Sequence, residues 1–389
     1  MMPMEIAPGI YDVGATDWIV RDFHGYKTER GASYNSYLIV DEKICLIDTV
    51  KACYAEELLE KIRRVADPAK IDYVVVNHVE PDHAGALPEV LKAAPNAKFV
   101  ITMQGKNEAL RHYGDGFDFM VVKEGDKISL GSRELTFVPM PMLHWPDNMV
   151  TYCPQDGILF SNDAFGQHYA SSKRFDDEVD EYVLFYEAKK YFANILWPYA
   201  RLIGGALKKA SALDIKMIAP AHGVIWRSKI AQILEKYAAW GTGINGKSVV
   251  IAYDTMWSGT EALARAMVEG AAAAGVNVQL MRMDRTPCST VAAELFEAGG
   301  LLVGSPTLNS GMMPTIGGML VYLKGLQPKG KKAAAFGTCG WAGGAQKDME
   351  AMLTAGGFDL QPGFNCKWRA CVDETEAARQ FAYEFAKNL

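Results

Sequence analysis

Four side chains that can bind metal ions fall within six consecutive residues of this chain. They are, in order, His78, Glu80, Asp82 and His83. The apolar run at 73–76 directly before them is typical of a short buried strand. Pro81 disfavours helix at Glu80, so we expect the four side chains on a loop at the strand end, before a helix at 84–94. Two imidazoles and two carboxylates this close are costly to bury without cations between them; the alternative is a surface turn with scattered polar residues.

The composition describes an ordinary globular protein that is long enough for two domains. The chain has 389 residues, of which 49% are hydrophobic and 22% are charged, and single cores rarely grow beyond about 250–300 residues. A net charge of −6 argues against a nucleic-acid partner, which needs a basic surface. No apolar run approaches the ~20 residues of a membrane span. Residues 1–8 lack the basic and apolar regions of a secretory signal.

The cysteines indicate the compartment. There are seven, and they form no pair of the C-x-x-C type. This pattern is typical of reduced thiols in a cytoplasm, and it excludes an appended rubredoxin-type or zinc-ribbon module. We therefore expect a cytoplasmic protein whose cysteines serve mainly in packing.

A change of pattern near residues 241–247, where three glycines mark a linker, divides the chain in two. Residues 1–245 alternate strand patterns with turns and some helices, which indicates two sheets sandwiched between helices. Residues 246–389 alternate strands and helices regularly, which indicates an open parallel sheet covered on both faces. Its five strands are expected at 248–253, 276–283, 301–304, 333–337 and 358–362. In the first half, helices are expected at 182–197 and 200–212.

Three further candidate ligands lie far along the chain in similar positions. His144, Asp163 and His222 each come directly after a predicted strand, so they can meet the first four at one sheet edge. Each alone is more often a core or turn residue than a ligand. Together the seven give four imidazoles and three carboxylates without a nearby cysteine, which is too many ligands for one tetrahedral site. The set suits two metal ions that share a bridging carboxylate.

Three polar, glycine-rich loops follow the first, third and fourth strands expected in the second half. In the first loop, hydroxyl groups and backbone N–H groups at a helix start can together hold a phosphate. The loop has no P-loop pattern and no lysine or arginine. Loops at these positions flank the FMN site of flavodoxin-like sheets. The candidate FMN-binding residues are Thr255, Met256, Trp257, Ser258, Thr260, Pro306, Thr307, Leu308, Asn309, Gly337, Thr338, Gly340, Trp341 and Ala342.

A plainer interpretation of these loops stays open. Glycine-rich loops after strands occur in any doubly wound fold, and Trp257 and Trp341 can serve in packing alone.

The order of the candidate ligands resembles that of a known family. The motif His-x-Glu-x-Asp-His at 78–83, followed by a distant His, Asp and His, is similar to the metallo-β-lactamase fold in its flavodiiron form. The short motifs Leu-His-Trp-Pro-Asp at 143–147 and Asn-Asp-Ala-Phe-Gly at 162–166 also resemble this family. The first loop of the second half resembles flavodoxin. The likeness covers nearly the whole chain.

This resemblance implies an α/β fold in two parts. Residues 1–245 would form a metallo-β-lactamase-like αββα sandwich that carries the diiron site. Residues 246–389 would form a flavodoxin-like, doubly wound, five-stranded parallel sheet that binds FMN.

The resemblance also implies roles for individual residues. One iron would bind His78, Glu80 and His144, the other would bind Asp82, His83 and His222, and Asp163 would bridge them. In hydrolytic zinc relatives the position of Glu80 is usually histidine, and a carboxylate there favours iron over zinc. His24 and Tyr191 resemble residues that line the gas pocket and donate a proton or hydrogen bond. A surface-loop histidine is the alternative for His24.

The function implied by the resemblance is reduction of dioxygen to water or of nitric oxide to nitrous oxide. Electrons would enter at FMN from a separate carrier such as rubredoxin, or from reduced coenzyme F420. The family works as a head-to-tail homodimer, or a dimer of dimers, in which the FMN of one chain faces the two irons of the other. Two rivals remain: a zinc-dependent hydrolase of the metallo-β-lactamase type with an accessory flavin domain, and an electron carrier with a degenerate metal site.

Overall fold

The computed structural model describes residues 2–389, which form two compact units. The N-terminal unit contains the residues up to Arg21, Thr28–Tyr191 and Arg201–Ala238, and the C-terminal unit contains Asp22–Lys27, Phe192–Ala200 and Ala239–Leu389. The units are therefore not continuous in sequence, and the division at 1–245 and 246–389 stays a prediction. Within residues 2–389, no helix has the length and apolar character needed to cross a bilayer.

Two sheets lie face to face in the N-terminal unit. The larger consists, in spatial order, of β1 (Met4–Ala7), β2 (Ile10–Asp12), β5 (Tyr37–Val40), β6 (Ile44–Ile47), β7 (Ile71–Val75), β8 (Lys98–Ile101) and β9 (Asp118–Val121). The smaller consists of β10 (Lys127–Ser129), β11 (Glu134–Pro139), β12 (Met149–Cys153), β13 (Ile158–Asn162) and β14 (Met217–Pro220). Strands β3 (Ala15–Asp17) and β4 (Ala32–Tyr34) pair separately. One apolar core joins the sheets, with Ile39 and Val75 from one and Phe137 and Phe160 from the other.

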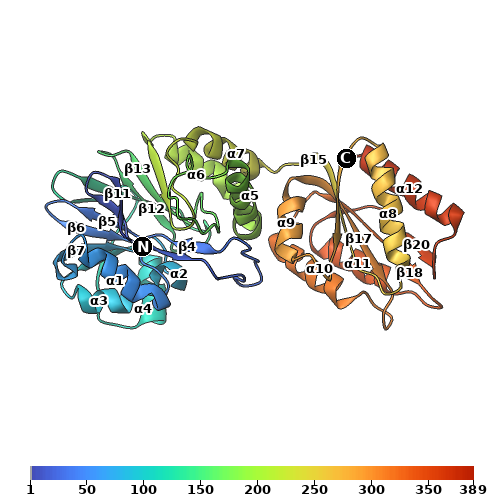
Figure 1. The fold of residues 1–389 in the computed structure, drawn as a ribbon, viewed down its shortest axis with the longest axis horizontal. Helices are drawn as coiled ribbons and strands as arrows, with labels where there is room; N and C mark the ends of the chain where they lie inside the picture. The colour runs from blue at the N-terminus through green and yellow to red at the C-terminus, as the bar shows by residue number, and fades with distance from the viewer. Residues whose placement is uncertain (1) are drawn as a thin grey trace. The chain divides into compact units, whose positions relative to one another are not determined.

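Helices cover both outer faces of this sandwich, as the αββα prediction requires (Figure 1). The helices of the larger sheet are η1 (Ala52–Tyr54), α1 (Ala55–Arg63), η2 (Pro68–Lys70), α2 (Pro81–Ala84), α3 (Leu87–Ala93) and α4 (Met103–Tyr113). The later helices are α5 (Glu181–Tyr191), η3 (Phe192–Leu196), η4 (Trp197–Leu202), α6 (Ile203–Ala210) and α7 (Ile230–Thr242). Helices α4 and α7 were not among the predicted elements with bounds.

The C-terminal unit is a doubly wound parallel sheet in the strand order of flavodoxin. Its strands are β16 (Asn277–Arg282), β15 (Gly246–Tyr253), β17 (Ala298–Pro306), β18 (Lys332–Cys339) and β19 (Asp359–Leu360), with β20 (Phe364–Lys367) also beside β18. One face packs on α8 (Gly259–Ala273) and α12 (Val372–Lys387). The other face packs on α9 (Cys288–Glu297), α10 (Pro314–Leu326) and α11 (Ala345–Ala355) (Figure 1).

The fifth position of this sheet differs from the prediction in detail. The expected strand at 358–362 is divided into β19 and β20, which both pair with β18. Pro362 lies between them, and proline cannot donate to a strand ladder. The flavodoxin-like fold is confirmed, and its last strand is made of two short pieces.

Two helix predictions were also imprecise. Asp82 and His83 lie in the short helix α2, which begins at Pro81, and not on a loop. Proline fits the first helical position because its missing N–H has no partner there in any helix. The helix expected at 182–197 ends as an α-helix at Tyr191 and continues as a π-helix over Phe192–Leu196.

Candidate metal centre and cofactor cavity

Seven titratable side chains converge where several strands of the N-terminal unit end. Two imidazoles and two carboxylates come from the segment after β7, and the others follow β11, β13 and β14. The residues are His78, Glu80, Asp82, His83, His144, Asp163 and His222, all of the predicted ligand set. Five are buried to 4% exposure or less. Only the side chains of Glu80 and His144 are partly exposed, at 16% and 15%, so the cluster opens to solvent on their side.

Asp163 lies between two halves of the cluster. Its Oδ2 is 3.7 Å from His78 Nε2 and 3.5 Å from His144 Nε2. Its Oδ1 is 3.4 Å from His83 Nε2 and 3.3 Å from His222 Nε2. One carboxylate therefore presents each of its oxygens to a different pair of imidazoles.

A further carboxylate completes each half. Glu80 Oε2 lies 3.3 Å from Nε2 of both His78 and His144. In the other half, Asp82 contacts Nε2 of His83 at 3.1 Å and Nε2 of His222 at 3.2 Å. Each half thus offers two imidazole nitrogens, one carboxylate of its own and one oxygen of the shared carboxylate.

Without metal ions, the imidazoles of the cluster would hold protons that balance its carboxylates. Burial alone would lower the pKa of His144, but the adjacent carboxylates of Asp163 and Glu80 raise it to about 9. Burial likewise disfavours the charged form of His222, whose contacts with Asp163 and Asp82 raise its pKa to about 10. Burial would raise the pKa of Glu80, but hydrogen bonds from His144 and His78 lower it to about 2. Metal ions would compete with these protons.

The cluster fits two metal ions. Four buried atoms of the cluster form no hydrogen bond within residues 2–389, namely Asp82 Oδ1, His83 Nδ1, His83 Nε2 and Asp163 Oδ2. Unsatisfied buried polar atoms are costly and call for an explanation such as an ion. The donor atoms of His78, His144 and Asp163 all lie within 4.8 Å of one another, and so do those of Asp82, His83 and His222. Mixed nitrogen and oxygen donors without thiolate suit iron.

Tyr191 and His168 border the cluster. Tyr191 is at the end of α5, and its hydroxyl donates a 2.8 Å hydrogen bond to Asp163 Oδ1. The hydroxyl of Tyr191 therefore faces the cluster, while its role in catalysis stays a prediction. The ring of His168 lies 5.1 Å from that of Tyr191 and 5.0 Å from that of His222. His168 could not be singled out from sequence, because a histidine after a turn has no distinguishing pattern.

Hydrogen bonds to the outer nitrogens orient two of the imidazoles. His78 Nδ1 lies 2.9 Å from both carboxylate oxygens of Asp147. His222 Nδ1 donates to the backbone carbonyl of Ser33 at 2.6 Å. Such partners fix the tautomer, so that Nε2 carries the lone pair toward the metal site.

A buried polar network lies behind the ligand segments. Asp48 accepts hydrogen bonds from the backbone N–H and the side-chain amide of Asn77, at 2.7 and 2.9 Å. The amide of Asn162 also reaches Asp48, and the amide of Asn148 donates to Asn162 Oδ1 at 3.1 Å. Each asparagine is next in sequence to His78, Asp147 or Asp163. The network therefore ties three separate segments of the site together.

A cavity of about 670 Å³ lies at the carboxyl ends of the strands of the C-terminal unit. Of the predicted FMN-binding residues, those that line it are Thr255, Met256, Trp257, Pro306, Thr307, Leu308, Asn309, Thr338, Gly340, Trp341 and Ala342. Ser258, Thr260 and Gly337 do not. Thr260 is fully buried and shares a 3.1 Å hydrogen bond with Thr338, so it supports the cavity wall from behind.

The sequence missed part of this cavity. Trp368 and Arg369 also line it, as do Gly259, Ser310 and Cys339. Trp368 and Arg369 follow β20, so predicting that strand would have placed them at the same sheet edge. The rings of Trp341 and Trp368 are 5.8 Å apart, which gives the cavity a flat aromatic border.

The cavity fits a phosphate-bearing flavin. Thr255 Oγ1 lines it and is buried, with no hydrogen-bond partner among residues 2–389. A phosphate oxygen at the start of α8 would satisfy this hydroxyl and would face the positive end of the helix dipole. Flat aromatic side chains suit an isoalloxazine ring.

His24 lies in the segment Asp22–Lys27, which belongs to the C-terminal unit. It has a left-handed backbone, and its ring contacts Phe23 edge-on at 4.9 Å. Lys27 N–H donates to Ser289 Oγ at 3.1 Å, which ties the segment to α9. The role of His24 in a gas pocket stays a prediction.

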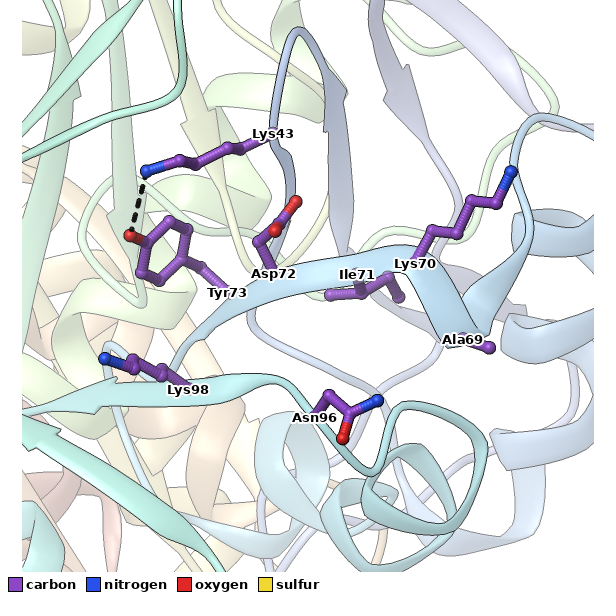
Figure 2. Close-up of a pocket in the computed structure, with 8 residues that line it drawn as sticks. All are labelled: Lys43, Ala69, Lys70, Ile71, Asp72, Tyr73, Asn96 and Lys98. Carbon is purple, nitrogen blue, oxygen red and sulfur yellow. Dashed lines mark hydrogen bonds between the residues drawn. The ribbon is translucent and has the colours of Figure 1, made fainter.

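A second cavity, of about 270 Å³, opens at the amino ends of β7 and β8 (Figure 2). Lys43, Lys70 and Lys98 line it, and Lys43 Nζ contacts Tyr73 Oη at 3.5 Å. Figure 2 shows the amino group of Lys70 directed away from the other two. The ligand residues follow the carboxyl end of β7, so this cavity is separate from the metal cluster.

Comparison with known proteins matches both halves of the chain. Residues 32–223 match the family described as ODP family beta lactamase, and residues 251–381 match flavodoxin. A nitric oxide reductase from Moorella thermoacetica is 46% identical over 394 residues, covering 100% of this chain and 99% of the relative. An anaerobic nitric oxide reductase flavorubredoxin from Klebsiella pneumoniae is 41% identical, covering 100% of this chain and 82% of the relative.

Solved structures agree over the full length. The flavodiiron protein from Giardia intestinalis superposes with a TM-score of 0.97 at 38% identity, covering 100% of this chain and 96% of the other. The rubredoxin oxygen:oxidoreductase from Desulfovibrio gigas also gives 0.97, at 39% identity, covering 100% and 98%. With the seven-residue cluster in one half and the cofactor cavity in the other, these matches establish that the chain belongs to the flavodiiron protein family.

Proposed function

We propose that this protein reduces dioxygen to water, nitric oxide to nitrous oxide, or both, at two non-haem iron ions. The observation that carries the proposal is Asp163, whose two oxygens face different imidazole pairs at 3.3–3.7 Å. A bridging carboxylate between two such half-sites suits a pair of metal ions that act on one small molecule. The names of the relatives from Moorella and Desulfovibrio, a nitric oxide reductase and an oxygen oxidoreductase, support both gases.

The geometry supports a division of ligands between the two ions. His78, Glu80 and His144 would hold one, and Asp82, His83 and His222 would hold the other, with Asp163 shared. The position of Glu80 favours iron, because a carboxylate is a harder ligand than imidazole.

Paired iron would supply single-electron chemistry and open coordination positions, and FMN would supply the electrons. The chain's own side chains shape where this happens. Glu80 and His144 are the exposed members, so the gas would enter past them. Tyr191 keeps its proton, because burial and then the charge of Asp163 raise its pKa well above the usual value. Its hydroxyl is therefore available as a hydrogen-bond donor at the bridging carboxylate.

FMN would bind in the cavity of the C-terminal unit, with its phosphate at Thr255 and the start of α8. We propose that electrons reach it from a separate carrier such as rubredoxin, or from reduced coenzyme F420. A head-to-tail homodimer or dimer of dimers would let the FMN of one chain serve the iron pair of another. All seven cysteines are free, which supports work in the reducing cytoplasm.

Gas consumption by the purified, iron-loaded and FMN-loaded protein tests the proposal. With chemically reduced rubredoxin as donor, dioxygen and nitric oxide consumption are measured side by side, together with the metal content. We expect turnover of at least one gas by wild type. His78→Ala should abolish turnover while leaving the FMN absorbance intact. Two zinc ions without iron in protein from its native host, together with no gas turnover, would instead favour the zinc-dependent hydrolase.

A further inference from the structure

We propose that Asp147 makes the two metal positions unequal, because its carboxylate lies behind His78 and strengthens that imidazole as a donor to one metal ion only. Asp147 is thus a positioning residue. The inference rests on the proposed function only in taking the seven clustered side chains as ligands of two metal ions.

The contact between Asp147 and His78 is well defined. Asp147 is 1% exposed, and both of its carboxylate oxygens are 2.9 Å from His78 Nδ1. The backbone N–H of Val79 donates to Asp147 Oδ2 at 2.8 Å. An ionised carboxylate only accepts hydrogen bonds, so His78 must carry its proton on Nδ1. His78 Nε2 is then free to donate its lone pair to a metal ion.

The surroundings hold Asp147 in this position. The hydroxyl of Thr102, the residue before α4, donates to the backbone carbonyl of Asp147 at 3.0 Å. Glu108 faces the same carboxylate from α4; burial and then the charge of Asp147 raise the pKa of Glu108, which favours its neutral form. The indole of Trp145 lies edge-on to the ring of His78, at 5.0 Å. The carboxylate therefore has little freedom to leave the imidazole.

Among residues 2–389, no carboxylate contacts the outer nitrogen of any of the other three imidazoles. His222 Nδ1 contacts a neutral backbone carbonyl. His83 Nδ1 is buried, and no group in residues 2–389 forms a hydrogen bond with it. The contacts of His144 with carboxylates are made through Nε2, which faces the cluster.

Asp147 therefore makes the two half-sites differ in the strength of one imidazole ligand. Apart from Asp147, each half has two imidazoles, one carboxylate and one oxygen of Asp163. A carboxylate on the outer nitrogen makes the imidazole more basic and raises metal affinity, and losing such a partner typically costs about 10–100-fold. We therefore expect the metal ion on the His78 side to be held more tightly. Its oxidised form should also be favoured over that of the other ion.

The variant Asp147→Asn tests this in the full-length protein. Anaerobic ferrous titration followed by metal analysis should show one iron bound about 10–100-fold more weakly, with the affinity of the other and the FMN content unchanged. Stepwise reduction with dithionite, followed by electron paramagnetic resonance, should show the second reduction step, from the half-reduced to the fully reduced iron pair, moving to a more positive potential. Loss of the carboxylate removes negative charge beside one ion, which makes its reduction easier.

Asp176→Asn is the matched control. Asp176 is fully buried in the same unit, and within the described part of the chain it accepts hydrogen bonds from backbone N–H groups only, including those of Ser228 and Lys229. This variant should keep both iron affinities and the potential, even where its melting temperature falls. An equal change in both variants, or equal weakening of both irons in Asp147→Asn, would overturn the inference.

The wild-type protein provides a test that does not depend on a variant folding. Removal of iron by increasing chelator should occur in two separated steps, and a single step for two equal irons would refute the inequality. These measurements need no turnover. A wild type that binds two unequal irons but consumes neither gas would contradict the proposed function alone.

Discussion

Asp48 holds Asn77 at two points, accepting its backbone N–H at 2.7 Å and its side-chain amide at 2.9 Å. Asn77 is followed directly by His78, and its own Oδ1 accepts the hydroxyl of Thr151 at 2.7 Å. The start of the main ligand segment is thus fixed by a buried carboxylate that faces no metal position.

Asp48→Ala should therefore loosen the metal site without removing a ligand. Two buried donors on Asn77 lose their acceptor, and each such loss costs about 1–3 kcal/mol. We expect the free energy of unfolding to fall by several kcal/mol, measured with urea, and the iron content to fall with it. Asp118→Ala, at an exposed strand start, should change the free energy by less than about 0.5 kcal/mol. If Asp48→Ala is destabilised but keeps its full iron content, the polar network around Asp48 is not needed for metal binding, and the prediction is wrong.

Tyr191→Phe should destabilise the metal-free protein. The hydroxyl of Tyr191 bonds to the carboxylate of Asp163, and hydrogen bonds to charged groups contribute about 1.5–3 kcal/mol. Tyr152→Phe is the comparison, because its partly buried hydroxyl donates to a neutral carbonyl, that of Asp214, at 2.9 Å. Chemical denaturation should show the larger loss for Tyr191→Phe. Equal losses would mean that the charge of Asp163 adds nothing to this bond.

Raising the pH should destabilise the metal-free protein. His144 and His222 have folded-state pKa values of about 9 and about 10, above the ~6.5 of an unfolded histidine. Their contribution to stability is complete below about pH 6.5 and is lost as the pH rises through about 9 to 10. Urea unfolding at about pH 6 and about pH 9.5 should show this loss. The iron-loaded protein should not show it, because metal ions replace the protons; an equal loss there would contradict the explanation.

Thr255→Ala should weaken FMN binding. The hydroxyl of Thr255 is buried at the cavity and has no hydrogen-bond partner among residues 2–389, so a bound phosphate would be its acceptor partner. Loss of one hydrogen bond to a charged group corresponds to roughly a tenfold or greater weakening. Fluorescence titration of the apoprotein with FMN measures this. Thr354→Ala is the control: the hydroxyl of Thr354 donates to the backbone carbonyl of Glu350 within α11, so its loss should leave the FMN affinity unchanged. An unchanged affinity in Thr255→Ala would mean that the phosphate binds elsewhere.

The positions of the seven candidate ligands could be predicted because of how sheets are built. His144, Asp163 and His222 each follow a strand, and strand ends at one edge of a sheet come together. The supporting carboxylates could not be found in this way. Asp48 lies in the loop directly after β6 and Asp147 lies in a turn, places where aspartate is common, and their partners Asn77 and His78 are far away in sequence.

The same limit applies to the cofactor cavity. Its loops after β15, β17 and β18 were predictable because a regular alternation of strands and helices gives a parallel sheet. Trp368 and Arg369 were missed because β20 is short and follows Pro362 and Gly363, which read as a turn. Local sequence patterns do not reveal that so short a segment pairs with β18.

The way the chain passes between the two units has a consequence for dividing the gene. The core of the C-terminal unit includes Phe192, whose ring lies 5.3 Å from that of Trp240 and 5.2 Å from that of Phe296. A polypeptide that begins at Gly246 would contain the whole parallel sheet but neither Phe192 nor Trp240. The ring of Phe296 would then lose its packing against Phe192. Recombination at the codon for Gly246 would therefore not transfer the flavodoxin-like half as a complete folding unit. The aromatic residues that pack together in this half are encoded on both sides of that codon.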